Sequence, residues 1–284
     1  DRVDPWAGAG CRIHWPYGWT ENWDTPFFLR DMETNKNFFQ IILSTNVEQD
    51  LRLPPLLEEA SLHSQGCLPG FSYKRWNNDS LRELIKTFFS KDVVDAYDSL
   101  VPLAYKSDLG RYCLLYQYGG WYADISVKII SKVILGIGVE GLGYFRDYGS
   151  GLPSPMANTF DVVNGLICSH ARHPVLEQCI NQIVRHVKAK YYGFSSVSPT
   201  GPRLLGRILA AYELGIVRQI GHFMPLTQGF KQRNLAYVAN SGEIFAWHKT
   251  TWHPSHPGGG NLADVGLQGT NNYNELWRAR EVYR

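Results

Sequence analysis

The sequence has 284 residues, of which 44% are apolar and 19% charged; this composition predicts a globular chain with a sizeable core rather than a disordered one. Its formal charge is +2, from 28 basic and 26 acidic residues that are interspersed, which argues against a dedicated nucleic-acid binder. The longest apolar runs are far shorter than the roughly 20 residues that cross a bilayer, so we expect no membrane-spanning helix.

The first part of the chain predicts an irregular segment followed by an α/β unit. Residues 1–37 show no hydrophobic period, whereas residues 38–43 form an apolar run typical of a short buried strand. Residues 71–76 alternate aromatic and polar side chains, which indicates a half-exposed strand. A helix is expected next, with a capping box between Ser80 and Glu83. A strand leading into a capped helix is the repeating unit of an α/β protein.

The middle of the chain predicts a helix, a sharp stop and a strand. Residues 107–118 carry an apolar stripe at helical spacing, and Gly119 and Gly120 provide a natural helix end, since one of them can adopt a left-handed conformation. Residues 121–127 then predict a strand, with Asp124 near its carboxyl end.

The remainder predicts two more helices and a hairpin. Pro174 and Pro202 each begin an amphipathic helix. Residues 237–239 and 244–247 flank an Asn-Ser-Gly turn and predict a β-hairpin. We therefore expect one domain over residues 38–255, with a C-terminal tail, residues 256–284, that packs on it.

Three charged residues suggest a binding site. Asp108 and Arg111 lie three apart and project from one face of the predicted helix, which on its own indicates only a surface ion pair. Asp124 closes an aromatic strand, where a carboxylate has no role in packing. Because ligands of open α/β sheets bind at the carboxyl ends of strands, these residues predict a site for a metal–diphosphate or a sugar hydroxyl.

The same segment resembles a known family. Residues 107–124 are similar to the signature of the retaining glycosyltransferases of family 32. They read Ser-Asp-x-x-Arg-Tyr-x-x-Leu-Tyr-x-Tyr-Gly-Gly-x-Tyr-x-Asp, from Ser107 to Asp124. That family includes fungal α-1,6-mannosyltransferases, α-1,4-galactosyltransferases and bacterial capsule and lipopolysaccharide enzymes. Weaker matches follow the family's order at residues 73–78, 164–174, 200–202 and 244–252.

The resemblance implies a GT-A-like single nucleotide-sugar-binding domain, with a mixed central sheet flanked by helices. It implies a retaining hexosyltransferase of polysaccharide or glycolipid biosynthesis, whose partners are a nucleotide-sugar donor and a glycan or glycolipid acceptor. Its donor-binding residues would be Asp108, Arg111, Asp124, Trp76, Thr200 and Gly201. For Trp76, as for Trp121, packing between layers is an equally open alternative to stacking on a ligand.

One position departs from the family pattern. The second carboxylate of its Asp-x-Asp motif is replaced by Ser126, a neutral and weaker ligand for a hard cation. The implied metal site, Asp124, His248 and Ser126, would therefore hold Mn²⁺ or Mg²⁺ weakly or not at all. Lys128, Lys249 or Arg203 could neutralise the diphosphate instead, and a third alternative is a non-catalytic sugar- or nucleotide-binding module.

For the mechanism we expect front-face departure, with Asp124, Asn164 and Arg111 as the catalytic set. No motif supports a nucleophile, although Asp147 and Asp161 are available. Asn164 would support the cationic sugar.

Two further features bear on chemistry and location. A zinc site at His248, His253, His256 and His222 lacks any strong spacing motif. The five cysteines form no CxxC pair, and those inside helical patterns favour a reducing compartment. We expect a cytoplasmic protein, peripheral at the inner membrane face, or a Golgi-lumenal domain if an N-terminal anchor has been removed.

Overall fold

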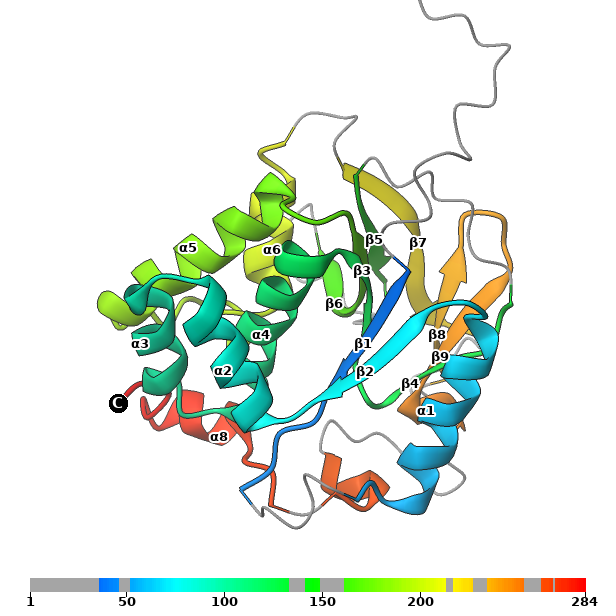
Figure 1. Ribbon diagram of the computed structural model, residues 1–284, viewed down its shortest axis with the longest axis horizontal. Coiled ribbons are helices and arrows are strands. Elements are labelled where there is room, and N and C mark those ends of the chain that lie inside the picture. The colour runs from blue at the N-terminus through cyan, green and yellow to red at the C-terminus, as the bar shows by residue number, and fades with distance from the viewer. Residues whose placement is uncertain are drawn as a thin grey trace, which may run out of the picture.

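The computed structural model describes residues 36–45, 52–132, 141–148, 161–212, 217–226, 234–252, 262–267 and 269–284. Within them, nine strands form one mixed sheet flanked by helices (Figure 1), which confirms the expected α/β class with a mixed central sheet. The strands are β1 (Asn37–Ile41), β2 (Ser72–Trp76), β3 (Gly120–Ala123), β4 (Val127–Ile129), β5 (Leu142–Asp147), β6 (Val162–Ser169), β7 (Val217–Pro225), β8 (Leu235–Ala239) and β9 (Ile244–His248). The helices are α1 (Pro55–Cys67), α2 (Asn78–Phe88), α3 (Lys91–Ser99), α4 (Leu103–Tyr118), α5 (Pro174–Lys188), α6 (Pro202–Leu209), α7 (Lys249–Trp252) and α8 (Tyr273–Arg278), with a 3₁₀ turn at Leu262–Val265.

The sheet has the order β2-β1-β3-β6-β5-β7-β8-β9-β4. Strand β1 pairs in parallel with β2 and β3, and β5 pairs in parallel with β7. The other pairs are antiparallel. Helices α2–α6 gather on one side of the sheet and α1 lies on the other (Figure 1).

Alternating side chains explain why the central strands are covered on both faces. Phe38 and Trp121 belong to the core cluster that includes Cys67 and Leu68 at the end of α1. Their neighbours Phe39 and Tyr122 belong to the cluster beneath α2–α6. Since successive side chains of a strand point to opposite faces, both faces of β1 and β3 are apolar and buried.

The start of α2 corrects one sequence prediction. The N-cap is Asn77 rather than Ser80: the Asn77 side chain accepts from the Ser80 amide, and the Ser80 hydroxyl accepts from the Asn77 amide. Ser80 is therefore the third residue of the helix, and Glu83 takes no part in the capping box. Asparagine and serine are equally good N-cap residues, so the sequence left the start of the helix uncertain by one turn.

The α4–β3 connection confirms the glycine stop and corrects the strand that follows. Gly119 and Gly120 have φ of 62° and 104°, which side chains with a Cβ rarely adopt. The predicted strand 121–127 is in fact two strands, β3 and β4, separated by a turn that contains Asp124 and Ser126. Asp124 therefore lies at the carboxyl end of β3, where the chain turns towards β4.

The later predictions are confirmed. Helices α5 and α6 begin at Pro174 and Pro202, and β8 and β9 form an antiparallel hairpin with Gly242 at φ 87°. Cys113 and Cys179 are buried and free, as expected for small apolar groups.

The described part of the C-terminal segment lies against the helical layer. Leu100 forms a β-bridge with Tyr283, and the Trp277 indole donates to the Tyr192 carbonyl at 2.8 Å. Among the described residues, no helix combines the length and the apolar character that crossing a membrane requires.

We predict that Gly120→Ala destabilises the fold strongly. A Cβ there would lie 2.4 Å from the Asn37 carbonyl oxygen, in the neighbouring strand, and would have to adopt φ of 104°. Strain and clash together should lower the free energy of unfolding by about 2–4 kcal/mol in urea denaturation. Gly242→Ala is the matched control: it has φ of 87° but open space, so it should cost about 1 kcal/mol. Equal losses would contradict the steric argument.

Candidate functional site

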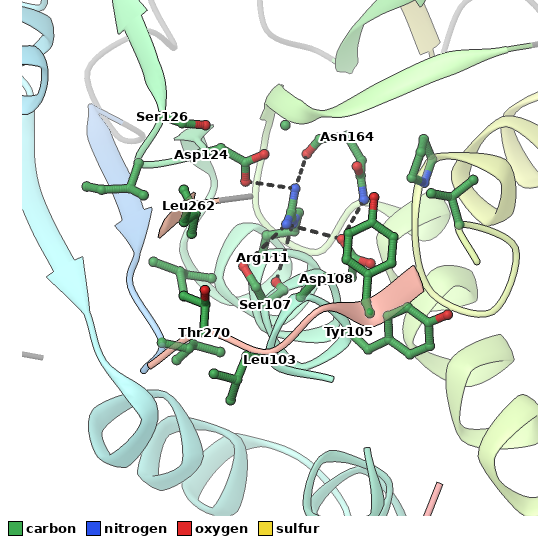
Figure 2. Close-up of a pocket in the computed structure, with 18 of the residues that line it drawn as sticks. Leu103, Tyr105, Ser107, Asp108, Arg111, Asp124, Ser126, Asn164, Leu262 and Thr270 are labelled. Carbon is green, nitrogen blue, oxygen red and sulfur yellow. Dashed lines mark hydrogen bonds and ion pairs between the residues drawn. The ribbon is translucent and has the colours of Figure 1, made fainter. Parts of the chain in front are cut away.

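The candidate site is a cavity of about 570 Å³ at the carboxyl ends of β1 and β3. Its lining comes from the ends of β1 and β3, the first half of α4, the start of β6, the end of β9 and the C-terminal segment. Figure 2 shows Asp108, Arg111, Asp124 and Asn164 joined by a continuous set of hydrogen bonds and ion pairs. The structure thus brings together residues that are 56 positions apart in the sequence.

Strand pairing places Asp124 and Asn164 side by side. Asp124 follows β3 directly, and its amide donates to the Gly165 carbonyl at 2.8 Å. Because β6 runs antiparallel to β3, the start of β6 meets the end of β3. A Cβ on Gly165 would lie 2.6 Å from Asp124 Oδ2, so glycine leaves the room that this carboxylate occupies.

Arg111 connects the site's two carboxylates. Its guanidinium lies 3.1 Å from Asp108 Oδ1 and 3.1 Å from Asp124 Oδ1, and Nη1 donates to the Asn164 carbonyl at 2.7 Å. Further bonds go to the carbonyl and hydroxyl of Ser107, one turn earlier in α4. Burial disfavours the charge on Arg111, but Asp124, Tyr122 and Asp108 outweigh that effect and raise the pKa of Arg111. The guanidinium is a fixed cation.

Asp108 is a buried group whose two oxygens are already engaged. Asn164 donates to Oδ1 at 2.8 Å, and Thr200 donates to Oδ2 at 2.8 Å. Burial raises the pKa of Asp108 above its usual value, and Arg111 and these hydrogen bonds oppose that rise. Gly201 packs close by, since a Cβ there would lie 3.3 Å from Asp108 Oδ2.

Asp124 is the carboxylate most open to a ligand. Its side chain is 38% exposed, against 11% for Asp108. The Tyr122 hydroxyl donates to Oδ1 at 2.7 Å, and Arg111 contacts the same oxygen. Oriented in this way, Asp124 can accept hydrogen bonds from ligand hydroxyls while Arg111 neutralises its charge.

The predicted metal ligands lie near one another but make a poor metal site. Asp124, Ser126 and His248 all line the cavity. Among the residues that the structure describes, no group of three His, Cys, Asp or Glu side chains could hold a metal ion. With a serine as the third donor and one oxygen of Asp124 bound to Arg111, the donor set does not fit the Asp-x-Asp metal site of the family that the sequence resembles.

Several sequence candidates lie elsewhere. Trp76 is buried outside the cavity lining, where it stacks near Tyr118 beneath the Lys74 ammonium. Trp121 is also buried and packs against Phe245. Thr200 and Gly201 support Asp108 rather than line the cavity. Asp147 and Asp161 are absent from the described lining.

The proposed zinc histidines do not come together in the described residues. The His222 ring packs against Tyr148, whereas His248 Nδ1 forms a hydrogen bond with the Thr250 hydroxyl. His253 and His256 lie outside the described residues.

One part of the cavity wall was not predicted from the sequence. Residues 270–274 line the cavity beside the start of α4: Asn271 accepts from the Leu103 amide, and Asn274 accepts from the Ser196 hydroxyl. These contacts join positions up to 168 residues apart, which no local pattern indicates. Tyr122 carried a usable signal, because it stands in the quoted signature two residues before Asp124.

Comparisons with known proteins agree on one class. Residues 32–139 match the family model described as "Glycosyltransferase sugar-binding region containing DXD motif". The chain is 31% identical over 123 residues to an uncharacterized glycosyltransferase of Acanthamoeba polyphaga mimivirus, covering 42% of this chain and 46% of that protein. It is 26% identical over 147 residues to inositol phosphoceramide mannosyltransferase 3 of Schizosaccharomyces pombe, covering 51% of this chain and 37% of the relative.

The chain thus spans less than half the length of the curated relatives it matches. Among solved structures, the chain is similar to PaToxG Glycosyltransferase, with a TM-score of 0.45 and 16% sequence identity. The match covers 62% of this chain and 69% of that one. The family matches confirm the resemblance read from the signature around Asp108, Arg111 and Asp124.

We predict that Thr200→Val weakens the site through Asp108. The valine keeps the shape but removes the donor to a buried carboxylate oxygen, which should lower the free energy of unfolding by about 1–3 kcal/mol. Chemical denaturation measures this loss. Thr200→Ser retains the hydroxyl and should stay near the wild type; a similar loss in both variants would assign the effect to the methyl group instead.

Proposed function

We propose that this chain transfers a sugar from a nucleotide-sugar donor to a glycan or glycolipid acceptor, with retention of configuration; the match of residues 32–139 to the glycosyltransferase sugar-binding region supports the proposal. The observation that carries the proposal is the Asp108–Arg111–Asp124 constellation, which lies within the matched region and lines the cavity. A GT-A-like donor site at the carboxyl ends of β1 and β3 accords with where α/β sheets bind ligands.

The cavity's charges suit a sugar. Asp124 accepts hydrogen bonds from hydroxyls at its exposed carboxylate, and the rigid guanidinium of Arg111 fixes its position. Asp108 acts through Arg111 and Asn164, because its own oxygens are already bonded. A preorganised site of this kind binds without the cost of orienting its own side chains.

The reaction that fits is front-face displacement. The bond from sugar C1 to the diphosphate oxygen breaks, and its electron pair stays on the diphosphate. The acceptor hydroxyl oxygen then bonds to C1 from the same face and passes its proton to the diphosphate. Asp108 is a poor nucleophile since both of its oxygens accept hydrogen bonds. The role we propose for Asn164, whose side-chain amide donates to Asp108 and Tyr112, is to stabilise the developing positive charge.

The divalent ion that enzymes of this class generally use contributes weakly or not at all in this chain. Ser126 offers a neutral hydroxyl where the Asp-x-Asp pattern has a carboxylate, and His248 is the only imidazole in the described lining. No step of the proposed reaction runs through Mn²⁺ or Mg²⁺.

The name of one relative bears on the acceptor. An inositol phosphoceramide mannosyltransferase acts at a lipid, so a glycolipid acceptor and a mannosyl donor are the first pair to test, with the chain working peripherally at a membrane surface. A cytoplasmic site of action is part of the same proposal.

The second candidate function is a non-catalytic module that binds the nucleotide sugar and stops there. Ser126 favours it, because loss of a metal-binding carboxylate is one way in which transfer could be lost. The two functions differ in one observable, which is whether bound donor is cleaved.

We predict that the purified chain releases nucleoside diphosphate from one of UDP-glucose, UDP-galactose, UDP-N-acetylglucosamine or GDP-mannose, assayed by chromatography with Mn²⁺ and with EDTA. Asp124→Asn should lower the rate by about 100-fold, because it removes the charge that pairs with Arg111. Asp98→Asn, which disrupts an exposed ion pair between Asp98 of α3 and Arg82 of α2, is the matched control and should leave the rate unchanged.

Binding of a donor without release would favour the non-catalytic module. Equal rates for wild type and Asp124→Asn would remove Asp124 from the mechanism. Neither binding nor release with any donor would contradict the proposed function as a whole.

A further inference from the structure

The Tyr237 side chain is part of the cavity wall and stands outside the hydrogen-bond network of Arg111. It belongs to β8, lines the cavity and is 3% exposed. Its ring packs edge-on against Phe145, with centroids 5.2 Å apart, and against Phe223 with centroids 4.7 Å apart. Because these buried rings hold the phenol ring in place, the position of its hydroxyl group is fixed before a ligand arrives.

The hydroxyl group of Tyr237 is open to the cavity. None of the described residues forms a hydrogen bond with it, and it is not among the polar atoms that are closed off from water without a partner. Buried tyrosines normally find a partner for this group, as Tyr97 and Tyr122 do. Burial, followed by the carboxylates of Asp124 and Asp147, raises the pKa of Tyr237 well above its usual value, so the group stays a hydrogen-bond donor.

Asp124 Oδ2 lies beside this hydroxyl group. A Cβ on Gly165 would lie 2.6 Å from Asp124 Oδ2 and 3.2 Å from the Tyr237 hydroxyl oxygen, so the two oxygens flank the same point above the glycine. The contacts that orient Asp124, from Tyr122 and Arg111, are both made at Oδ1. No described residue donates a hydrogen bond to Oδ2, which leaves that oxygen to accept one from a ligand.

An acceptor and a donor on either side of one point suit a hydroxyl group. A hydroxyl donates one hydrogen bond and accepts another, and each O–H···O contact spans about 2.7–2.8 Å. One ligand hydroxyl can therefore donate to Asp124 Oδ2 and accept from Tyr237, over Gly165, which has no side chain to fill the space. A hydrogen atom, a fluorine or an amide nitrogen in its place would satisfy at most one of the two protein groups.

We propose that Tyr237 is a specificity-determining residue for the donor sugar: its hydroxyl group and Asp124 Oδ2 together bind one hydroxyl group of the hexose. This inference rests on the proposed function, in which the hexose occupies the cavity at Asp124. It narrows the substrate to sugars that carry a free hydroxyl group at the bridged position. Removing the phenol hydroxyl deletes one hydrogen bond to the sugar and none among the described residues.

The test is calorimetric titration of the wild type and Tyr237→Phe with UDP-glucose, UDP-galactose, UDP-N-acetylglucosamine and GDP-mannose, and with UDP and GDP alone. Each titration is run in Mn²⁺ and in EDTA. For the sugar nucleotide that the wild type binds, Tyr237→Phe should raise the Kd by about 5- to 10-fold, as expected for one hydrogen bond between neutral groups. The Kd of the matching UDP or GDP should change by less than about twofold, because neither carries the hexose.

Mono-deoxy analogues of that sugar nucleotide identify the bridged hydroxyl group. The analogue that lacks it should bind the wild type and Tyr237→Phe with the same Kd to within about twofold, because the interaction that the variant removes is already missing. The other analogues should keep the full effect of Tyr237→Phe. A coupling confined to one ring position is a result that a purely structural role of the hydroxyl would not produce.

Tyr97→Phe is the matched control, a buried tyrosine outside the described cavity lining whose hydroxyl group donates to Asn78 at 3.0 Å. It should leave every Kd unchanged and lower the melting temperature by about 2–4 °C, because it removes a hydrogen bond within the fold. Tyr237→Phe should show the opposite pattern. Its melting temperature should lie within about 1 °C of the wild type or above it, because it leaves no described group without a partner.

The outcomes separate this inference from the proposed function. Three results overturn the role of Tyr237 and leave the proposed function standing. They are an unchanged Kd for the sugar nucleotide in a folded Tyr237→Phe, an equal loss for the sugar nucleotide and for UDP or GDP, and a melting temperature lowered as in Tyr97→Phe. Failure of the wild type to bind any of these probes overturns both.

Discussion

The buried guanidinium of Arg111 is the interaction on which the site depends. It holds Asp108 and Asp124 together although one lies in α4 and the other follows β3, and it also binds the backbone of β6 at Asn164. Removing one partner from a buried ion pair typically costs about 3–5 kcal/mol, because the other charge stays buried without compensation. The same contact therefore joins three elements of the fold and orients the carboxylate that faces the cavity.

The sequence predicted this centre because its parts are local. Asp108 and Arg111 lie one helical turn apart, the glycine pair ends α4, and Asp124 follows within a few residues. Thr200 and Asn164 came from the family resemblance, which implied donor binding for Thr200 and support of the cationic sugar for Asn164. The structure shows them as donors to Asp108, which the motif alone did not indicate.

What the sequence did not predict depends on contacts between distant segments. The wall formed by residues 270–274 exists because the C-terminal segment lies back against α4, and a polar stretch carries no sign of its partner. Trp76 was ambiguous for a related reason: an aromatic side chain at a strand end serves packing or stacking equally well, and only its neighbours decide. The antiparallel pairing of β4 with β9, which sets Val127 opposite His248, is likewise a long-range property.

A crystal structure of the chain with a non-hydrolysable nucleotide sugar, grown in EDTA, tests the central claim most directly. The account predicts a hexose in the cavity, with hydroxyl groups within hydrogen-bond distance of Asp124 and Arg111. A nucleotide sugar bound outside this cavity, or one whose hexose faces away from Asp124, would contradict it.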